Sequence, residues 1–237
     1  MGTVDLPIKR STAYAALAAS LLAACGGAEP RPNDEAAPVV AILASPGGTA
    51  TEKLRAGDPA GARAAYEAAL AADPDRLAPL NDLAVAYLVQ GHGEAARRLL
   101  DEVVAHGSPP EQQAALLNLG ELYALDGYPA AAEAYLETAR GLDPERPGSW
   151  YALALLADAR GQLDQARAAI REAVRLDDGA AARAELAYVY PEERVHLEAL
   201  VAEQAGDAAL AAARWRELAA SRYGSLSAAA ERHLSGE

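Results

Sequence analysis

Pairs made of an alanine and a large side chain four residues later recur along the chain. Five such pairs are Ala62 with Tyr66, Ala96 with Leu100, Ala132 with Leu136, Ala166 with Ile170, and Ala211 with Trp215. Residues four apart lie on one face of a helix. Each pair therefore predicts a helix whose alanine allows a neighbouring helix to approach closely and whose large residue fills the gap one turn later.

A glycine precedes each of these pairs by five residues. The five glycines are Gly57, Gly91, Gly127, Gly161 and Gly206, so both series advance in the same steps of 34, 36, 34 and 45 residues. Glycine commonly ends a helix because it adopts the left-handed backbone conformation without strain. The two matching series predict five helix pairs, each with its first helix closed by a glycine.

The first helices carry a second pattern, which is most regular between residues 116 and 144. There the chain reads Leu116-x2-Leu119-Gly120-x2-Tyr123, followed by Gly127, Ala132-x3-Leu136 and Pro144. This stretch resembles a tetratricopeptide repeat (TPR), whose signature is W-x2-L-G-x2-Y…A-x3-F…P with a period of 34 residues. The resemblance extends from about Thr49 to Leu234. It implies an all-α fold, a TPR-type α-solenoid of about five helix pairs.

Other first helices match the signature less evenly. The helix with Leu83 and Tyr87 matches well, the one beginning at Trp150 has Ala157 in place of Tyr, and the last is poor. The first repeat is truncated to about residues 49–56. Eleven residues beyond the regular period are inserted within 179–191, a span that contains an Ala-rich stretch, 181–188, which we expect to be helical and to interrupt the stacking. Residues 225–234 predict a solvent-facing capping helix.

The N-terminal residues have the pattern of an export signal. Lys9 and Arg10 precede an apolar run over 11–24, which is shorter than the roughly 20 residues of a membrane-spanning helix. Leu22-Ala23-Ala24-Cys25 resembles the lipobox of bacterial lipoproteins. The resemblance implies a signal peptide over 1–24, lipid attachment at Cys25 and, because Gly26 follows, sorting to the outer membrane. A buried free cysteine and a catalytic thiol are the alternatives for Cys25.

Residues 25–48 predict a flexible tether that links the lipidated cysteine to a helical repeat domain over 49–237. This segment is rich in Gly, Pro and small polar residues, and it contains one apolar island, Val39 to Leu43. Leaving such an island in water is costly. We expect the island to cover an exposed end of the helical array, and the alternative is a short disordered stretch.

Charge and composition exclude several classes of function. The formal net charge is −13 at pH 7, and nucleic-acid binding needs clustered Lys and Arg. A single cysteine excludes an intramolecular disulfide. The apolar share of 51% is largely Ala, with no Phe, which favours thin helical layers over one thick core.

The sequence contains no recognisable catalytic motif. A phosphate-binding loop, a dinucleotide-binding glycine pattern, H-E-x-x-H and C-x-x-C are all missing from it. We expect His92, His106, His196 and His233 to be separate solvated residues. Glu192 and Glu193 are expected to stabilise the start of a helix through its dipole. The sequence thus predicts no catalytic residues, no metal or cofactor site and no small-molecule substrate.

The TPR resemblance implies a protein-binding groove on the concave face, lined by the first helices. The predicted groove residues are Asn81, Val85, Leu88, Leu117, Glu121, Tyr151, Leu155 and Asp158. None is basic, so a hydrophobic or basic partner segment fits better than an acidic peptide terminus. The alternative is that several of the apolar members belong to the core.

Together these features predict a lipid-anchored, non-enzymatic TPR adaptor of the bacterial cell envelope, on the periplasmic face of the outer membrane. Its partners would be other envelope proteins or peptides. Two further hypotheses are a periplasmic peptide-binding or chaperone-like module for transient clients, and a non-catalytic subunit of an envelope enzyme complex.

Overall fold

The computed structural model describes residues 36–45, 47–177, 186 and 189–236, and within them the chain forms eleven α-helices. The first helices of the pairs are α2 (Thr49–Arg55), α4 (Leu77–Val89), α6 (Pro109–Leu125), α8 (Pro147–Ala159) and α10 (Pro191–Ala205). The second helices are α3 (Pro59–Ala72), α5 (Gly93–His106), α7 (Pro129–Leu142), α9 (Leu163–Leu176) and α11 (Ala208–Leu218), and α12 (Gly224–Ser235) follows. The all-α solenoid of five helix pairs is confirmed.

The glycines predicted to close the first helices do so. All five have a positive φ, from 73° at Gly161 to 80° at Gly127. After Gly127, the Tyr128 N–H donates to the carbonyl of Tyr123 at 2.8 Å, which is the hydrogen bond of a Schellman motif. The chain can therefore reverse direction within two or three residues, and the two helices of a pair lie against each other.

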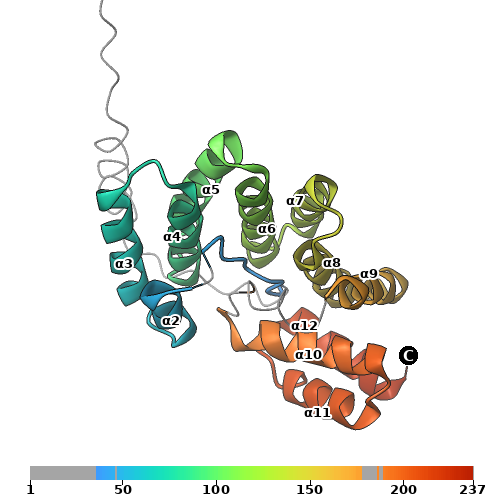
Figure 1. Ribbon diagram of the computed structural model, residues 1–237. Coiled ribbons are helices and arrows are strands. Elements are labelled where there is room, and N and C mark those ends of the chain that lie inside the picture. The colour runs from blue at the N-terminus through green and yellow to red at the C-terminus, as the bar shows by residue number, and fades with distance from the viewer. Residues whose placement is uncertain (1–35, 46, 178–185, 187–188, 237) are drawn as a thin grey trace, which may run out of the picture.

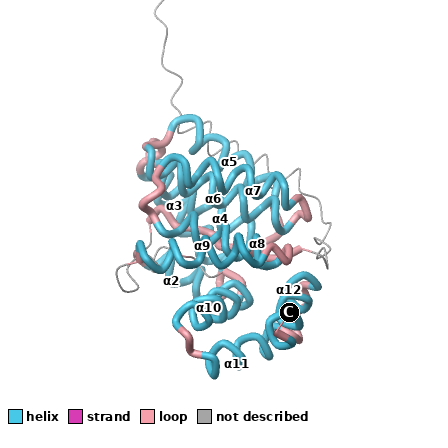
Figure 2. Tube along the Cα trace, turned by 90° about the vertical axis from the view of Figure 1, so that its right-hand side faces the viewer, coloured by secondary structure: helices cyan, strands magenta, loops and turns pink. Residues whose placement is uncertain are grey.

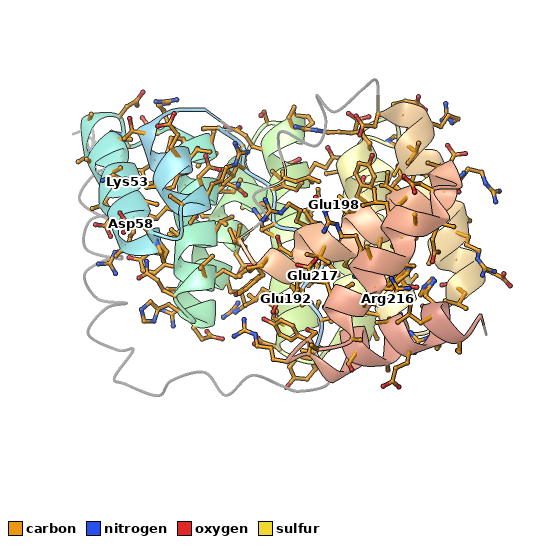
Figure 3. All side chains as sticks on the ribbon, turned by 90° about the horizontal axis from the view of Figure 1, so that it is seen from below. Lys53, Asp58, Glu192, Glu198, Arg216 and Glu217 are labelled. Carbon is orange, nitrogen blue, oxygen red and sulfur yellow. The ribbon has the colours of Figure 1, made fainter. Side chains whose placement is uncertain are left out.

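The helix pairs α2 to α9 follow an arc, and the last three helices lie beneath it (Figures 1 and 2). Helix α10 packs against α8 and α9, and α12 packs against α11 and α8. Seen from below, α10 and α11 lie in front of the arc, with Arg216 and Glu217 on the outer face of α11 (Figure 3). The concave side of the array is thus covered by its own C-terminal helices.

The predicted capping helix exists as α12, but it is not only a solvent-facing cap. Leu226, Ala229 and Ala230 are fully buried, and Arg232 Nη2 donates to the backbone carbonyl of Asp158 on α8 at 2.8 Å. Helix α12 therefore closes the end of the array and also returns to its middle.

The predicted helix over 181–188 lies outside the described residues except for Leu186. Leu186 is fully buried and forms an isolated antiparallel β-bridge with Ile42. At this one position the backbone is extended and pairs with the N-terminal segment.

Close packing between α6 and α7 depends on Gly120. A Cβ added there would overlap the Leu136 side chain, with the Leu136 Cγ 2.8 Å away and the Ala132 carbonyl at 3.5 Å. The TPR signature places glycine at this position, and here it lets the large residue of the second helix reach the first helix.

Replacing Gly120 by Ala should lower the free energy of unfolding by about 1–3 kcal/mol, because the added methyl group forces α6 and α7 apart. Gly141 is the matched control: it also lies in a helix, but a Cβ there meets nothing within 4 Å. Gly141→Ala should be neutral or stabilise by up to about 1 kcal/mol. Urea denaturation of both variants measures the difference, and equal effects would contradict this account of Gly120.

Candidate functional site

The concave groove of the array holds residues 36–45 as an extended segment (Figure 1). Val39, Val40 and Ala41 are 0% exposed, Ile42 is 2% exposed and Leu43 is 1% exposed. Each aliphatic side chain contributes about 1.5–3 kcal/mol when fully buried. The four large residues together contribute on the order of 6–12 kcal/mol, which is comparable to the stability of a whole domain.

The apolar island therefore docks, but not where the sequence suggested. It lies along the groove formed by α4, α6 and α8, where we expected it to cover an exposed end of the array. With the first repeat it shares the hydrogen bond that Thr51 Oγ1 donates to the carbonyl of Ser45 at 3.0 Å and a core cluster that includes Leu43 and Leu54. A groove has two walls and an end has one, so the groove buries both faces of an extended chain.

Asparagine side chains hold the backbone of Ile42 at the centre of the groove. Asn118 Oδ1 accepts the Ile42 N–H at 2.7 Å, and Asn118 Nδ2 donates to the Ile42 carbonyl at 2.9 Å. Asn81 Nδ2 donates to the same carbonyl at 3.1 Å, and Asn118 Nδ2 also donates to Asn81 Oδ1 at 2.9 Å. One amide side chain thus satisfies both backbone groups of one residue, as a neighbouring β-strand would.

Carboxylates hold the backbone on either side of Ile42. The Val39 N–H donates to Glu121 Oε2 at 2.6 Å. The N–H groups of Ala44 and Ser45 donate to the two oxygens of Asp82, at 2.7 and 3.0 Å. Burial raises the pKa of Asp82 to about 6, against the opposing effect of these donors, so Asp82 is ionised at neutral pH and can accept both hydrogen bonds.

The side chains of the segment enter the core of the array. Val39, Val40 and Ile42 share one cluster with Leu117, Tyr151 and Leu155 of α6 and α8. Ala41 and Leu43 share the other with Val85 and Leu88 of α4. The segment thus joins the two halves of the core.

All eight predicted groove residues are buried, with exposed fractions between 0% and 4%. Asn81 and Glu121 bind the segment directly, and the apolar members pack in the clusters that include it. Asp158 has a different role, because its carboxylate binds two histidines.

Sequence reasoning missed Asp82 and Asn118, each of which makes two hydrogen bonds with the backbone of the segment. Both stand one residue before the second leucine of the first-helix pattern, Leu83 and Leu119. The sequence did carry a signal for these two residues: each is a polar residue at the same repeat position of an otherwise apolar helix.

Glu193 was expected to act through the dipole of α10, but it is fully buried and meets Glu121. Burial raises the pKa of both carboxyl groups, and the negative charge of Glu121 raises the pKa of Glu193 further. Two carboxylates this close cannot both be ionised, so the pair retains a proton at neutral pH. Glu121 also accepts the Val39 N–H, so the carboxyl group of Glu193 on α10 is buried next to the residue of α6 that binds the docked segment.

The prediction that the histidines are separate and solvated is wrong for His196 and His233. His196 Nε2 lies 2.7 Å from Asp158 Oδ2, and His233 Nε2 lies 2.7 Å from Asp158 Oδ1. His196 is 0% exposed and His233 is 6% exposed. The folding of α10 and α12 beneath α8 brings together residues that are far apart in the sequence.

His233 is held between two acceptors. Its Nδ1 lies 2.8 Å from Glu203 Oε1, and its ring stacks on Trp215 at 4.0 Å between centroids. Burial lowers the pKa of His233, but the hydrogen bonds to Asp158 and Glu203 and their charges outweigh it and raise the pKa to about 9. A carboxylate can only accept, so both ring nitrogens carry a proton. The imidazolium joins α8, α10 and α12.

This cluster has a structural role. Burial raises the pKa of Asp158, but the two histidines outweigh this effect and hold the pKa well below its ordinary value. Both nitrogens of His233 are engaged, so its ring cannot act as a general base. Among the described residues, no group of three or more His, Cys, Asp or Glu side chains could hold a metal ion.

None of the helices in the described part of the chain combines the length and the apolar character that crossing a membrane requires.

Family models match the chain in two places. A tetratricopeptide repeat model matches residues 53–119, and a second tetratricopeptide repeat model matches residues 121–181. The two matches cover more than half of the chain. The chain is a tetratricopeptide repeat protein.

Solved structures of TPR proteins are similar to this chain. The thermophilic TPR protein TTC0263 of Thermus thermophilus has the same fold: it is 22% identical, with a TM-score of 0.51, and the match covers 79% of this chain and 100% of that one. MamA is 20% identical, with a TM-score of 0.44, and the match covers 80% of this chain and 98% of that one. No curated protein sequence matches this TPR protein. TPR arrays are protein-interaction scaffolds, and that general role applies here.

Stability should fall as the pH rises from 6 to 9. The folded pKa of His233, about 9, exceeds its ordinary value of 6.5, so the stabilisation by its proton is complete below 6.5 and is lost as the pH passes 9. The Glu121–Glu193 pair has raised pKa values and acts in the same direction. We expect a loss of about 1–3 kcal/mol in the free energy of unfolding.

Denaturation in urea at several pH values measures this loss. His233→Gln should flatten the profile between pH 7 and 9. A wild-type protein that becomes more stable over this range would contradict the assignment of a charged His233.

Asn118→Ala should loosen the docked segment. The Ile42 N–H loses its acceptor and stays buried, which costs about 1–3 kcal/mol. Thermolysin, which cleaves before aliphatic residues, should then cut within residues 39–43, with the site identified by mass spectrometry. Gln165→Ala, at an exposed position of α9, is the control and should remain as resistant as the wild type. Equal resistance of Asn118→Ala would rule out the clamp.

Proposed function

We propose that this TPR protein is a lipid-anchored adaptor of the bacterial cell envelope that holds partner proteins by an extended segment in its concave groove. One observation carries the proposal: buried side chains of α4 and α6 bind the N–H groups of an extended backbone at four positions and the carbonyl group of Ile42. A surface that only packs helices has no need for such acceptors, because helices satisfy their own backbone groups.

The chemistry of the groove favours an apolar segment. Glu121 and Asp82 accept backbone N–H groups, while Leu117, Tyr151 and Leu155 provide apolar walls. Recognition of the backbone tolerates many sequences, and the walls select uncharged side chains. This combination suits an adaptor that grips a partner's extended chain and does not suit an acidic peptide terminus.

The proposed anchor is the lipidated Cys25, which lies outside the described residues. Ala36, where the docked segment begins, is the eleventh residue after Cys25. At about 3.3–3.6 Å per residue, this stretch spans at most roughly 40 Å. The array would therefore stay close to the membrane, on the periplasmic face of the outer membrane under the sorting rule that Gly26 suggests.

Cys25→Ser should move the protein from the membrane fraction to the soluble fraction, because the thiol that receives the lipid is removed. Ser11→Ala is the matched control: it changes the same signal region without touching the lipobox. Immunoblots of fractionated cells measure the distribution. Continued membrane association of Cys25→Ser would show that the anchor is not this lipid.

A crosslinked pull-down from membranes, analysed by mass spectrometry, tests the adaptor function. A stable adaptor yields one partner in stoichiometric amount. Many sub-stoichiometric peptides would instead indicate the chaperone-like module, and an enzyme as the single partner would indicate the non-catalytic subunit. Crosslinks should map to α4, α6 and α8; crosslinks confined to the second helices would contradict binding in the groove.

A further inference from the structure

We infer that residues 36–45 are an internal substitute for the partner, and that the groove accepts in exchange an extended, uncharged apolar segment with the same spacing of backbone N–H groups. The inference rests on the proposed function and specifies what the groove recognises. It commits to one kind of occupant, whose chemistry can be read from the segment now bound.

The segment has the features of a bound ligand. It lies outside the repeats, and residues 46–48 are the covalent link from its C-terminal end to the first repeat. Its hydrogen bonds to the groove come from its backbone and reach side chains 37 to 82 residues away in the sequence. The helices, in contrast, pair with their immediate neighbours, α4 with α5 and α6 with α7. Residues 36–45 therefore contact the groove as an extended peptide would, and not as a further helix of the array.

The hydrogen bonds define the positions at which a partner needs an N–H group. These positions correspond to Val39, Ile42, Ala44 and Ser45. Proline has no N–H, so a partner segment cannot place proline there. Proline at the position before Val39 is allowed, as Pro38 shows.

Burial defines which side chains are allowed. The five positions from Val39 to Leu43 are at most 2% exposed, and burying a charge there without a partner is costly. At the position of Ile42 the space is bounded by Gly148, where a Cβ would lie 3.4 Å from the Ile42 Cδ1 and 3.9 Å from a methyl group of Leu117. That position therefore takes an aliphatic side chain and excludes charged ones.

Exchange replaces each contact by an equivalent one. An incoming segment with the same pattern regains the hydrogen bonds to Asn118, Glu121 and Asp82 and buries similar side chains. The resident segment has the advantage of being attached, which corresponds to an effective concentration in the millimolar range for a short connection. A free peptide should therefore bind the wild type weakly. A substitution that weakens the contacts of the resident segment with the groove should make binding of the free peptide detectable.

The experiment uses the full chain and a fluorescent peptide with the sequence of residues 36–45, AAPVVAILAS. Ile42→Ala removes a large buried side chain of the resident segment and leaves the side chains of the groove unchanged. Fluorescence anisotropy should show that this variant binds the peptide at least about ten-fold more tightly than the wild type. The milder variant Ile42→Val, which keeps the fold if Ile42→Ala does not, should show a smaller gain.

Two controls separate exchange from general loosening. Leu136→Ala removes a side chain of similar size that is likewise buried but lies between α6 and α7, and it should not gain binding. Adding Asn118→Ala to Ile42→Ala should abolish the gain, as should a peptide N-methylated at the Ile42 nitrogen. Equal binding by Leu136→Ala, or no gain with either Ile42 variant, would overturn the inference.

The result is distinguishable from a failure of the proposed function. A partner crosslinked to the groove in membranes, together with a peptide that never exchanges, overturns only the assignment of residues 36–45 as a substitute. The absence of any crosslinked partner overturns the adaptor function, whatever the peptide does.

Discussion

The concave face of this array depends on mutual satisfaction of buried polar groups. Asn81, Asp82, Asn118 and Glu121 are all fully buried, and in an empty dry groove they would carry a large desolvation cost. An extended backbone faces the complementary problem, because its N–H and C=O groups lack partners. When residues 36–45 lie in the groove, the four side chains bind backbone groups of the segment, and the apolar side chains between them are removed from water.

Closure of the array over the segment follows from the same constraint. The Asp158 carboxylate is held by two histidines from α10 and α12, and Glu193 of α10 is buried beside Glu121, which accepts the N–H of Val39. Both clusters are buried ionisable groups, which are stable only when each has a partner of suitable charge or protonation. They favour one arrangement of the C-terminal helices, and that arrangement covers the groove.

The docked segment also changes the role of the concave surface that TPR proteins use for binding. In this chain the groove residues are at most 4% exposed, so they serve at present as core. The same residues can be core and binding site, because what they bind now is a segment of the chain that belongs to no helix pair. The repeat fold alone does not determine whether the groove is open or filled. The outcome depends on which extended segment, internal or from a partner, competes more effectively for the groove.

The sequence by itself determined the helix pairs, because the repeated glycines and alanines act between neighbouring helices. Gly120 is the clearest case: its missing side chain makes room for Leu136 of the next helix. Tertiary structure alone decided what fills the groove. The bond between Asn118 and Ile42 spans 76 residues, and no periodicity links such positions, because they meet only once the helices have stacked. The apolar character of residues 39–43 showed that they must be covered, and the curvature of the solenoid determined that the groove covers them.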